Sequence, residues 1–233
     1  MTWVAGVDGY KNGWFVVLYE VRSGNVSCVA KQSFAEVLSL PQRPKVIAVD
    51  IPIGLLDAAQ HGGRDCDMKA RQLLRDRRSA VFSPLVRAAI CAMNYESAKR
   101  ANQESSPSNI AISKQAHAIS PKIHEVDALM TRELQNRIFE VHPEFCFLEL
   151  AGHPMKNSKK TEAGYRERKG FLPEFREIIQ QLEMQHPPKL KKDDVLDACA
   201  ACGTAKRIHE KIAIRIPSDP PIDSRGLRME MRR

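Results

Sequence analysis

The chain has 233 residues, 43% of them hydrophobic and 27% charged, as expected of a globular protein with a buried core. No apolar stretch approaches the roughly 20 residues that a membrane-spanning helix needs, which excludes a transmembrane protein, and the first residues lack the features of a signal peptide, so we expect a cytoplasmic protein. Lys and Arg outnumber Asp and Glu by 36 to 28, and the net charge of +8 favours a polyanionic partner without establishing one.

Strands joined by tight turns are predicted at the start of the chain. Runs of β-branched and aromatic residues lie at 3–8, 13–20 and 26–32. A short helix should follow, with Ser33 as its N-cap. The continuous apolar run at 45–50 then predicts a central strand that is covered on both faces.

The middle of the chain is predicted to be helical. Candidate helices lie at 66–74, 86–93, 95–103 and 123–134. We interpret residues of about 57–134 as a helical insertion in a single domain that spans 1–233.

The last part of the chain returns to alternating elements. We expect a strand at 137–142, a short helix, a Lys-rich loop at 156–160, a helix at 173–184, a new segment at Pro187-Pro188, a helix at 193–210 and a strand at 212–216. The order of elements predicts an α/β fold with a mixed sheet, flanked by helices, that has antiparallel hairpins at one side.

Two cysteines have the spacing of a metal-binding pair. Cys199 and Cys202 lie in an Ala-rich helical run, and no second pair completes a zinc site. We therefore expect them to pack as small residues of a helix, and we expect the scattered cysteines of the chain to be reduced thiols.

Carboxylates follow the apolar runs of several predicted strands. Asp8 and Asp50 end two of these runs, and Glu144 follows a third. Parallel strands would bring their carboxyl ends to one edge of the sheet, where open α/β sheets place their sites. In the last helix, Asp194 and Asp197 share a face at i, i+3. We expect these acids to meet in one cleft as catalytic residues.

Clustered carboxylates repel one another and need neutralisation. Mg²⁺ and Mn²⁺ prefer oxygen ligands, and two such ions about 3.5–4 Å apart can activate water in phosphodiester hydrolysis. We therefore expect the cluster to bind Mg²⁺ or Mn²⁺ through Asp8, Asp50, Asp194 and Asp197.

Each acid also has a structural interpretation. Asp8 and Asp50 could cap the turns that follow them, Asp194 could cap a helix start, and Glu144 could begin a helix. Asp197 is hardest to explain in this way, because it follows the cap among apolar residues, where a small acid is a poor helix former.

Four segments together carry a family resemblance. They are Gly-Val-Asp-Gly-Tyr-Lys-Asn-Gly-Trp at 6–14, Asp-Ile-Pro-Ile-Gly-Leu at 50–55, Val-His-Pro-Glu at 141–144 and Asp-Asp-Val-Leu-Asp-Ala at 193–198. In this order they resemble the family catalogued as domain of unknown function four-two-nine, which is regarded as one of predicted nucleases with a ribonuclease H-like fold. The likeness covers nearly the whole chain and includes residues 77–84 and 223–230.

The resemblance implies a ribonuclease H-like mixed five-stranded sheet flanked by helices. It also implies that Asp8 is the first-strand acid that bridges both metal ions, that Asp50 is the acid at the end of the fourth strand, and that Asp194 and Asp197 are the paired acids of the last helix. The wider superfamily has no fixed counterpart of Glu144, and His142 is a candidate proton shuttle.

Basic residues concentrate in the predicted insertion. Guanidinium groups suit phosphate, and the residues expected to bind substrate are Arg71, Arg75, Arg77, Arg78 and, in the first turn, Lys11. The alternative is a solvated helix face, which would include Arg64 and Arg87, with Asp65, Asp67 and Asp76 as partners. We interpret as surface charge Lys156, Lys159, Lys160, Arg228, Arg232 and Arg233.

The sequence thus predicts a divalent-metal-dependent nuclease that hydrolyses phosphodiester bonds in DNA or RNA. One alternative is a non-catalytic or small-molecule phosphate-binding protein of the same fold. Another is a phosphotransferase of the actin or sugar-kinase type, but the chain lacks a second phosphate-binding turn. Carboxylates favour the nuclease, because an anion-binding pocket should not be lined with acids unless a metal ion is present.

Overall fold

The computed structural model describes residues 1–185 and 190–233. The chain forms two compact units: unit 1 contains residues 1–50, 137–214 and 232–233, and unit 2 contains residues 51–136 and 215–231. The predicted insertion at about 57–134 falls within unit 2, while the predicted break at Pro187-Pro188 lies outside the described residues. Among the helices described, none is long and apolar enough to cross a membrane.

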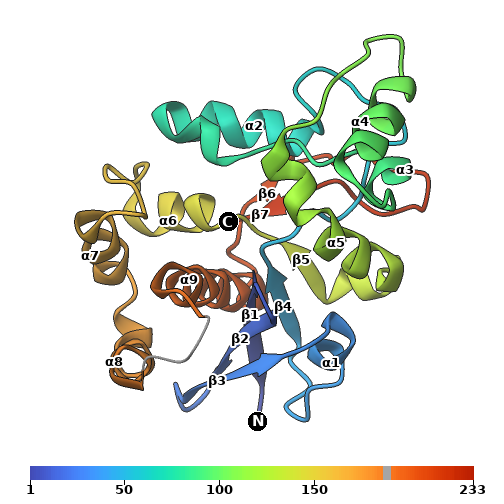
Figure 1. Cartoon of the computed structure of the whole chain (residues 1–233). Coiled ribbons are helices and arrows are strands. Elements are labelled where there is room, and N and C mark those ends of the chain that lie inside the picture. Colours follow the sequence, from blue (N-terminus) through green and yellow to red (C-terminus); the bar gives the residue numbers. More distant parts are fainter. Residues whose placement is uncertain (186–189) are drawn as a thin grey trace. The chain divides into compact units, whose positions relative to one another are not determined.

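Unit 1 is built on a mixed five-stranded sheet with the order β3-β2-β1-β4-β5 (Figure 1). Its strands are β1 (Trp3–Tyr10), β2 (Gly13–Glu20), β3 (Val26–Lys31), β4 (Val46–Val49) and β5 (Ile138–Glu140). The first three strands are antiparallel neighbours, β4 lies parallel to β1, and β5 lies parallel to β4. The predicted α/β fold with a five-stranded mixed sheet and flanking helices is therefore confirmed.

Helices of unit 1 flank this sheet. They are α1 (Phe34–Leu38), α6 (Pro143–Ala151), α7 (Glu162–Gly170), η3 (Pro173–Phe175), α8 (Arg176–Gln185) and α9 (Lys192–His209). As predicted, Ser33 caps α1, with its Oγ accepting a hydrogen bond from the amide of Glu36 at 3.3 Å. The sequence analysis did not predict α7, which begins where the side chain of Thr161 accepts a hydrogen bond from the amide of Gly164.

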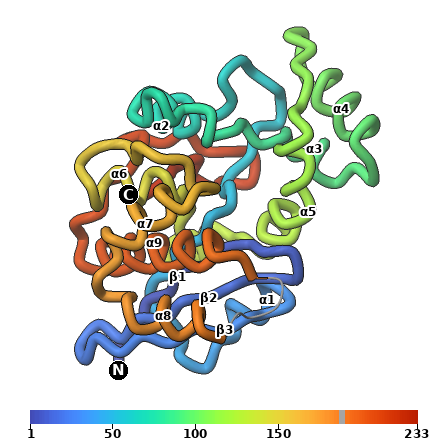
Figure 2. The backbone as a smooth tube through the Cα atoms, turned by 60° about the vertical axis from the view of Figure 1, so that its left-hand side comes forward, coloured from blue at the N-terminus to red at the C-terminus, as the bar shows by residue number. Residues whose placement is uncertain are grey.

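The two faces of the sheet in unit 1 carry different helices, because successive strand residues point to opposite sides. On one face, Trp14 of β2 meets Phe34 of α1 edge to face, with ring centroids 5.1 Å apart. The other face holds Phe15, Val17 and Tyr19 of β2 in the main core cluster. Helix α9 covers this second face and packs on β1, β2 and β4 (Figure 2).

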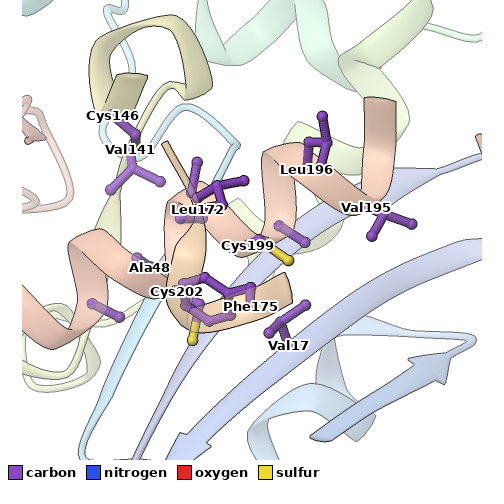
Figure 3. Packing of buried hydrophobic residues seen from close by; sticks show 14 of the residues in the cluster. Val17, Ala48, Val141, Cys146, Leu172, Phe175, Val195, Leu196, Cys199 and Cys202 are labelled. Atoms are coloured by element: carbon purple, nitrogen blue, oxygen red, sulfur yellow. The ribbon is translucent and has the colours of Figure 1, made fainter. Parts of the chain in front are cut away.

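The contact between β1 and α9 depends on Gly6. A Cβ atom at this position would lie 2.0 Å from the backbone nitrogen of Cys202 and 2.2 Å from the carbonyl oxygen of Ala198. On α9, Cys199 and Cys202 are free thiols and fully buried, beside Val17 and Ala48 of the sheet (Figure 3). The prediction that the CxxC pair packs as small residues of a helix is confirmed.

The remaining helices of the described residues lie in unit 2. They are α2 (Asp65–Leu74), η1 (Arg75–Ala80), α3 (Arg87–Ile90), α4 (Tyr95–Glu104), α5 (Lys114–Leu129) and η2 (Leu134–Asn136). Two short strands, β6 (Arg215–Ile216) and β7 (Met231–Arg232), pair with each other. The prediction of a helix at 123–134 is wrong at both ends, because Ser113 caps the helix and Pro121 lies inside it. The strand predicted at 212–216 is limited to its last two residues.

Two of the arginines of unit 2 are structural. Arg64 is 1% exposed, pairs with Asp67 at 2.7 Å and donates to the carbonyls of Ile53 and Gly54. Arg87 pairs with Asp127 at 3.1 Å and with Asp223 at 2.5 Å. Of the partners that the sequence analysis named for a solvated helix face, Asp67 does pair with Arg64, but the pair is buried and not solvated, and the partners of Arg87 were not among those named.

We predict that Gly6→Ala destabilises the chain by about 3 kcal/mol or more, because its methyl group would meet backbone atoms of α9 that cannot give way without moving the helix. Urea unfolding of the variant measures the effect. Gly170→Ala is the matched control: a Cβ atom there meets nothing within 4 Å, and its effect should stay within about 1 kcal/mol. Equal stabilities of the two variants would contradict this view of the contact.

Candidate active site

Asp8 and Asp50 lie level with each other at the carboxyl ends of two parallel strands. Val7 of β1 pairs with Val49 of β4, and the amide of Asp50 donates to the carbonyl of Val7 at 3.0 Å. Asp8 directly follows Val7, and Asp50 directly follows Val49, so the two aspartates are neighbours across the paired strands. Gly6 and Ala48 lie on the face that α9 covers. Asp8 comes two residues after Gly6, and Asp50 comes two residues after Ala48, so strand alternation puts both aspartates on the same face.

Helix α9 adds the remaining acids of the cluster. Its residues 198–202 contact Gly6, so the turn that precedes them, which contains Asp197, is near the carboxyl end of β1. Asp197 is 3% exposed and Asp8 is 7% exposed. Asp194 also acts on Asp8 electrostatically, but one of its oxygens accepts a hydrogen bond from the amide of Lys191 at 3.1 Å and caps the helix. Asp194 thus has the structural role that the sequence analysis left open.

Burial raises the pKa of Asp8, Asp50 and Asp197, and neighbouring carboxylates raise it further at Asp8 and Asp197. Burial is the largest cause in each case, and it raises the pKa of Asp50 and that of Asp197 to about 6. The pKa of Asp8 is raised well above its ordinary value, first by burial and then by the charges of Asp50 and Asp197. These carboxyl groups are therefore close enough to affect one another, and their ionisation together opposes folding.

Lys159 supplies a positive charge to the cluster. Its Nζ donates to Oδ2 of Asp197 at 2.6 Å. The interpretation of Lys159 as surface charge is therefore wrong, although its neighbours Lys156 and Lys160 are exposed. The cause of the error is that a run of lysines is typical of solvated loops, and the partner of Lys159 lies 38 residues away along the chain.

The C-terminal arginines are also less free than predicted. Arg232 stacks on Phe139 and Arg233 on Phe145, each with its guanidinium carbon 5.3 Å from the ring centroid. In unit 2, Arg228 donates to the carbonyl of Gln135 at 2.9 Å. Aromatic rings and carbonyls hold these side chains half-buried, so the interpretation of the tail as plain surface charge is wrong.

Glu144 has a buried cationic partner. Its Oε1 accepts from Nη2 of Arg168 at 2.5 Å, and the side chains are 6% and 1% exposed. Glu144 also lies in the first turn of α6, after Pro143, where an acid is favoured by the helix dipole. His142 is the N-cap residue of the same helix. The catalytic role expected for Glu144 stays a prediction, and the sequence analysis missed Arg168, whose partner could not be read from the chain.

The donor atoms of the cluster have the chemistry that a hard divalent cation requires. Oδ1 of Asp197 is buried and accepts no hydrogen bond from any residue that the structure describes. Over residues 1–185 and 190–233, however, no group of three His, Cys, Asp or Glu side chains is arranged to hold a metal ion. The oxygen donors therefore fit Mg²⁺ or Mn²⁺ in kind, and binding would require the side chains to draw together.

The predicted phosphate-binding residues belong to both units. In unit 2, a surface pocket of about 660 Å³ is lined by Arg71, Gln72, Arg75, Asp76 and Arg78. Arg71 is partly engaged already, because it donates to the carbonyls of Val81 and Gly62 and to the hydroxyl of Ser83. Arg77 is half-buried in η1, and Lys11 of unit 1 is exposed in the turn between β1 and β2.

Comparison with known proteins identifies a family. The model of the family described as "Protein of unknown function (DUF429)" matches residues 6–222. No curated protein and no solved structure matches the chain.

We predict that Asp50→Asn stabilises the metal-free chain at pH 8 but not at pH 4. The pKa of Asp50 is about 6 in the folded chain against an ordinary value of 3.8, so the folded state binds more protons between these values. The free energy of unfolding must then fall as the pH rises through this window. The substitution removes that loss, which is about 1 to 3 kcal/mol above pH 6.

Urea unfolding in EDTA at the two pH values measures this difference. Asp219→Asn, at an exposed carboxylate, is the matched control and should change stability by a similar small amount at both. If Asp50→Asn also had the same effect at pH 4 and pH 8, burial would not govern the pKa of this carboxylate.

Proposed function

Because the chain belongs to the DUF429 family, whose description assigns no activity, we propose from the site itself that the protein is a divalent-metal-dependent nuclease that hydrolyses phosphodiester bonds in nucleic acid. One observation carries the proposal: β1, the end of β4 and α9 bring Asp8, Asp50 and Asp197 together, with Asp8 and Asp197 buried and Asp50 half-buried. The resident cation would be Mg²⁺ or Mn²⁺, and the partner would be DNA or RNA.

A ribonuclease H-like fold for unit 1 is part of the same proposal. The supporting features are the five-stranded mixed sheet, the antiparallel β1-β2-β3 side and the parallel β4 and β5. These are the features that the family resemblance implies. The final helix α9 carries Asp194 and Asp197, which the resemblance implies are the paired acids of the last helix, and it packs on β1.

The case for a cation rests on electrostatics. Three neighbouring carboxylates, two of them buried and one half-buried, are unfavourable when ionised at neutral pH unless positive charge compensates them. Lys159 compensates part of this charge. Hard divalent cations take carboxylate oxygens as ligands and keep several waters, so they could supply the remainder and still leave room for a substrate oxygen.

The residues of the chain would divide the work. Asp8, Asp50 and Asp197 would hold the cation, with Asp194 at the edge of the cluster. When bound, such a cation polarises a phosphate oxygen and lowers the pKa of an attacking water. In unit 2, Arg75 and Arg78 line a pocket whose guanidinium groups suit phosphate, and the role predicted for them in substrate binding stays a prediction.

We predict that the native chain cleaves labelled DNA or RNA in Mn²⁺ or Mg²⁺ and not in EDTA. Asp8→Asn should lower the rate by about a hundredfold or more, because it removes a charged cation ligand with little change in shape. Asp219→Asn, which makes the same chemical change at an exposed position, should leave the rate unaltered.

The outcomes separate the candidate functions. Cleavage that survives Asp8→Asn undiminished would contradict a catalytic role for the cluster. Mn²⁺ binding without cleavage of either polymer would favour the non-catalytic or small-molecule phosphate-binding alternative. Comparing rates on DNA and RNA in the same assay would assign the substrate.

A further inference from the structure

Lys159 brings a positive charge to the edge of the acid cluster, with its side chain still 38% exposed. Its ammonium lies 2.6 Å from Oδ2 of Asp197. Burial alone would lower the pKa of this ammonium, but the charges of Asp197, Asp50 and Asp8 outweigh burial and raise it. The same lysine thus interacts with each of the three acids that form the candidate cation site.

The loop that carries Lys159 is held by α7. Two backbone amides of the loop, at 156–157, donate to the carboxylate of Glu167 at 2.8 and 2.9 Å. The loop also lies directly against the helix, because a Cβ atom at Gly164 would be 1.9 Å from the carbonyl oxygen of Ser158. These contacts fix the backbone on the N-terminal side of Lys159.

A buried ion pair joins this loop to α6. Arg168 donates to the carbonyl of Asn157 at 3.0 Å and to Oε1 of Glu144 at 2.5 Å. Both charged side chains are almost fully buried, so removing either would leave the other uncompensated in a place that water does not reach. The anchoring of the loop by two helices positions the half-buried Lys159 on Asp197, whereas the next residue, Lys160, is exposed.

The two carboxylate oxygens of Asp197 differ in their hydrogen bonding. Oδ2 is bound by Lys159, whereas Oδ1 is buried and accepts no hydrogen bond from the described residues. One oxygen of this carboxylate is thus available to a metal ion. Asp194 is left out of the charge count because its carboxylate caps α9 through the amide of Lys191. When Asp8, Asp50 and Asp197 are ionised, their three negative charges and the one positive charge of Lys159 leave two negative charges, which a single divalent cation neutralises.

We propose that Lys159 is a built-in counter-ion that takes the place of a second divalent cation, so that the acid cluster binds one Mg²⁺ or Mn²⁺ ion and not two. The inference rests on the proposed function of the cluster as a cation site. It assigns a role to Glu144, Glu167 and Arg168 as well, which position the lysine through its loop and do not contact the metal ion.

Titration calorimetry with MnCl₂ tests this inference by counting ions per chain. Native protein should bind one Mn²⁺. Lys159→Met, which keeps a stem of similar length without the charge, should bind two. Lys160→Met removes the same charge from the neighbouring exposed residue and should bind one, as should Lys159→Arg, which keeps a cation in the cluster.

Thermal unfolding gives a readout that does not depend on activity. In EDTA at pH 8, Lys159→Met should melt at a lower temperature than native protein, because three repelling carboxylates lose their counter-ion. Saturating Mn²⁺ should raise the melting temperature of Lys159→Met more than that of native protein or Lys160→Met, because two bound ions stabilise the folded state more than one.

The results distinguish the failure of this inference from that of the proposed function. Two ions per native chain, or an unchanged count of one in folded Lys159→Met, would overturn the role of Lys159 and leave a metal-dependent nuclease standing. A count of two ions for native protein would overturn the role of Lys159 even if Lys159→Met does not fold. No Mn²⁺ binding and no cleavage by native protein would overturn the proposed function, and this inference with it.

Discussion

The close approach of β1 to α9 is the constraint on which the rest of unit 1 depends. Gly6 lets the backbone of the strand touch the helix between Ala198 and Cys202, which leaves no room for even a methyl group. This contact sets the height of α9 on the sheet, and Asp197 is thereby brought to Asp8 and Asp50. The same packing buries Asp8 and Asp197 and half-buries Asp50, and the loss of solvent contact is the largest cause of their raised pKa values. A counter-charge is the electrostatic consequence, and Lys159 provides part of it.

Much of the sheet and the acid cluster could be predicted from the sequence, because the signals are local. Strands β1 to β3 are β-branched and aromatic runs between tight turns, and β4 is a short continuous apolar run. Asp8 and Asp50 end such runs, and parallel pairing alone then brings them level. Asp197 was a candidate because an acid among apolar helix residues has no local explanation.

The parts that could not be predicted depend on partners far along the chain. Lys159 resembles its neighbours in sequence, and only the anchoring of its loop by Glu167 and Arg168 distinguishes it. Arg87 reads as a surface cation, yet its partner Asp223 lies 136 residues away. Helix α5 was misplaced because Pro121 is usually a helix start or a break, whereas here tertiary packing tolerates it within the helix.

The most direct test is to locate Mn²⁺ by anomalous X-ray diffraction from crystals of the native chain grown with MnCl₂. The account predicts one anomalous peak, bounded by the carboxylates of Asp8, Asp50 and Asp197, with the ammonium of Lys159 still on Asp197. Two peaks with Lys159 displaced would contradict the single-ion site. A well-ordered cluster with no peak at all would contradict the claim that these acids are gathered to hold a cation.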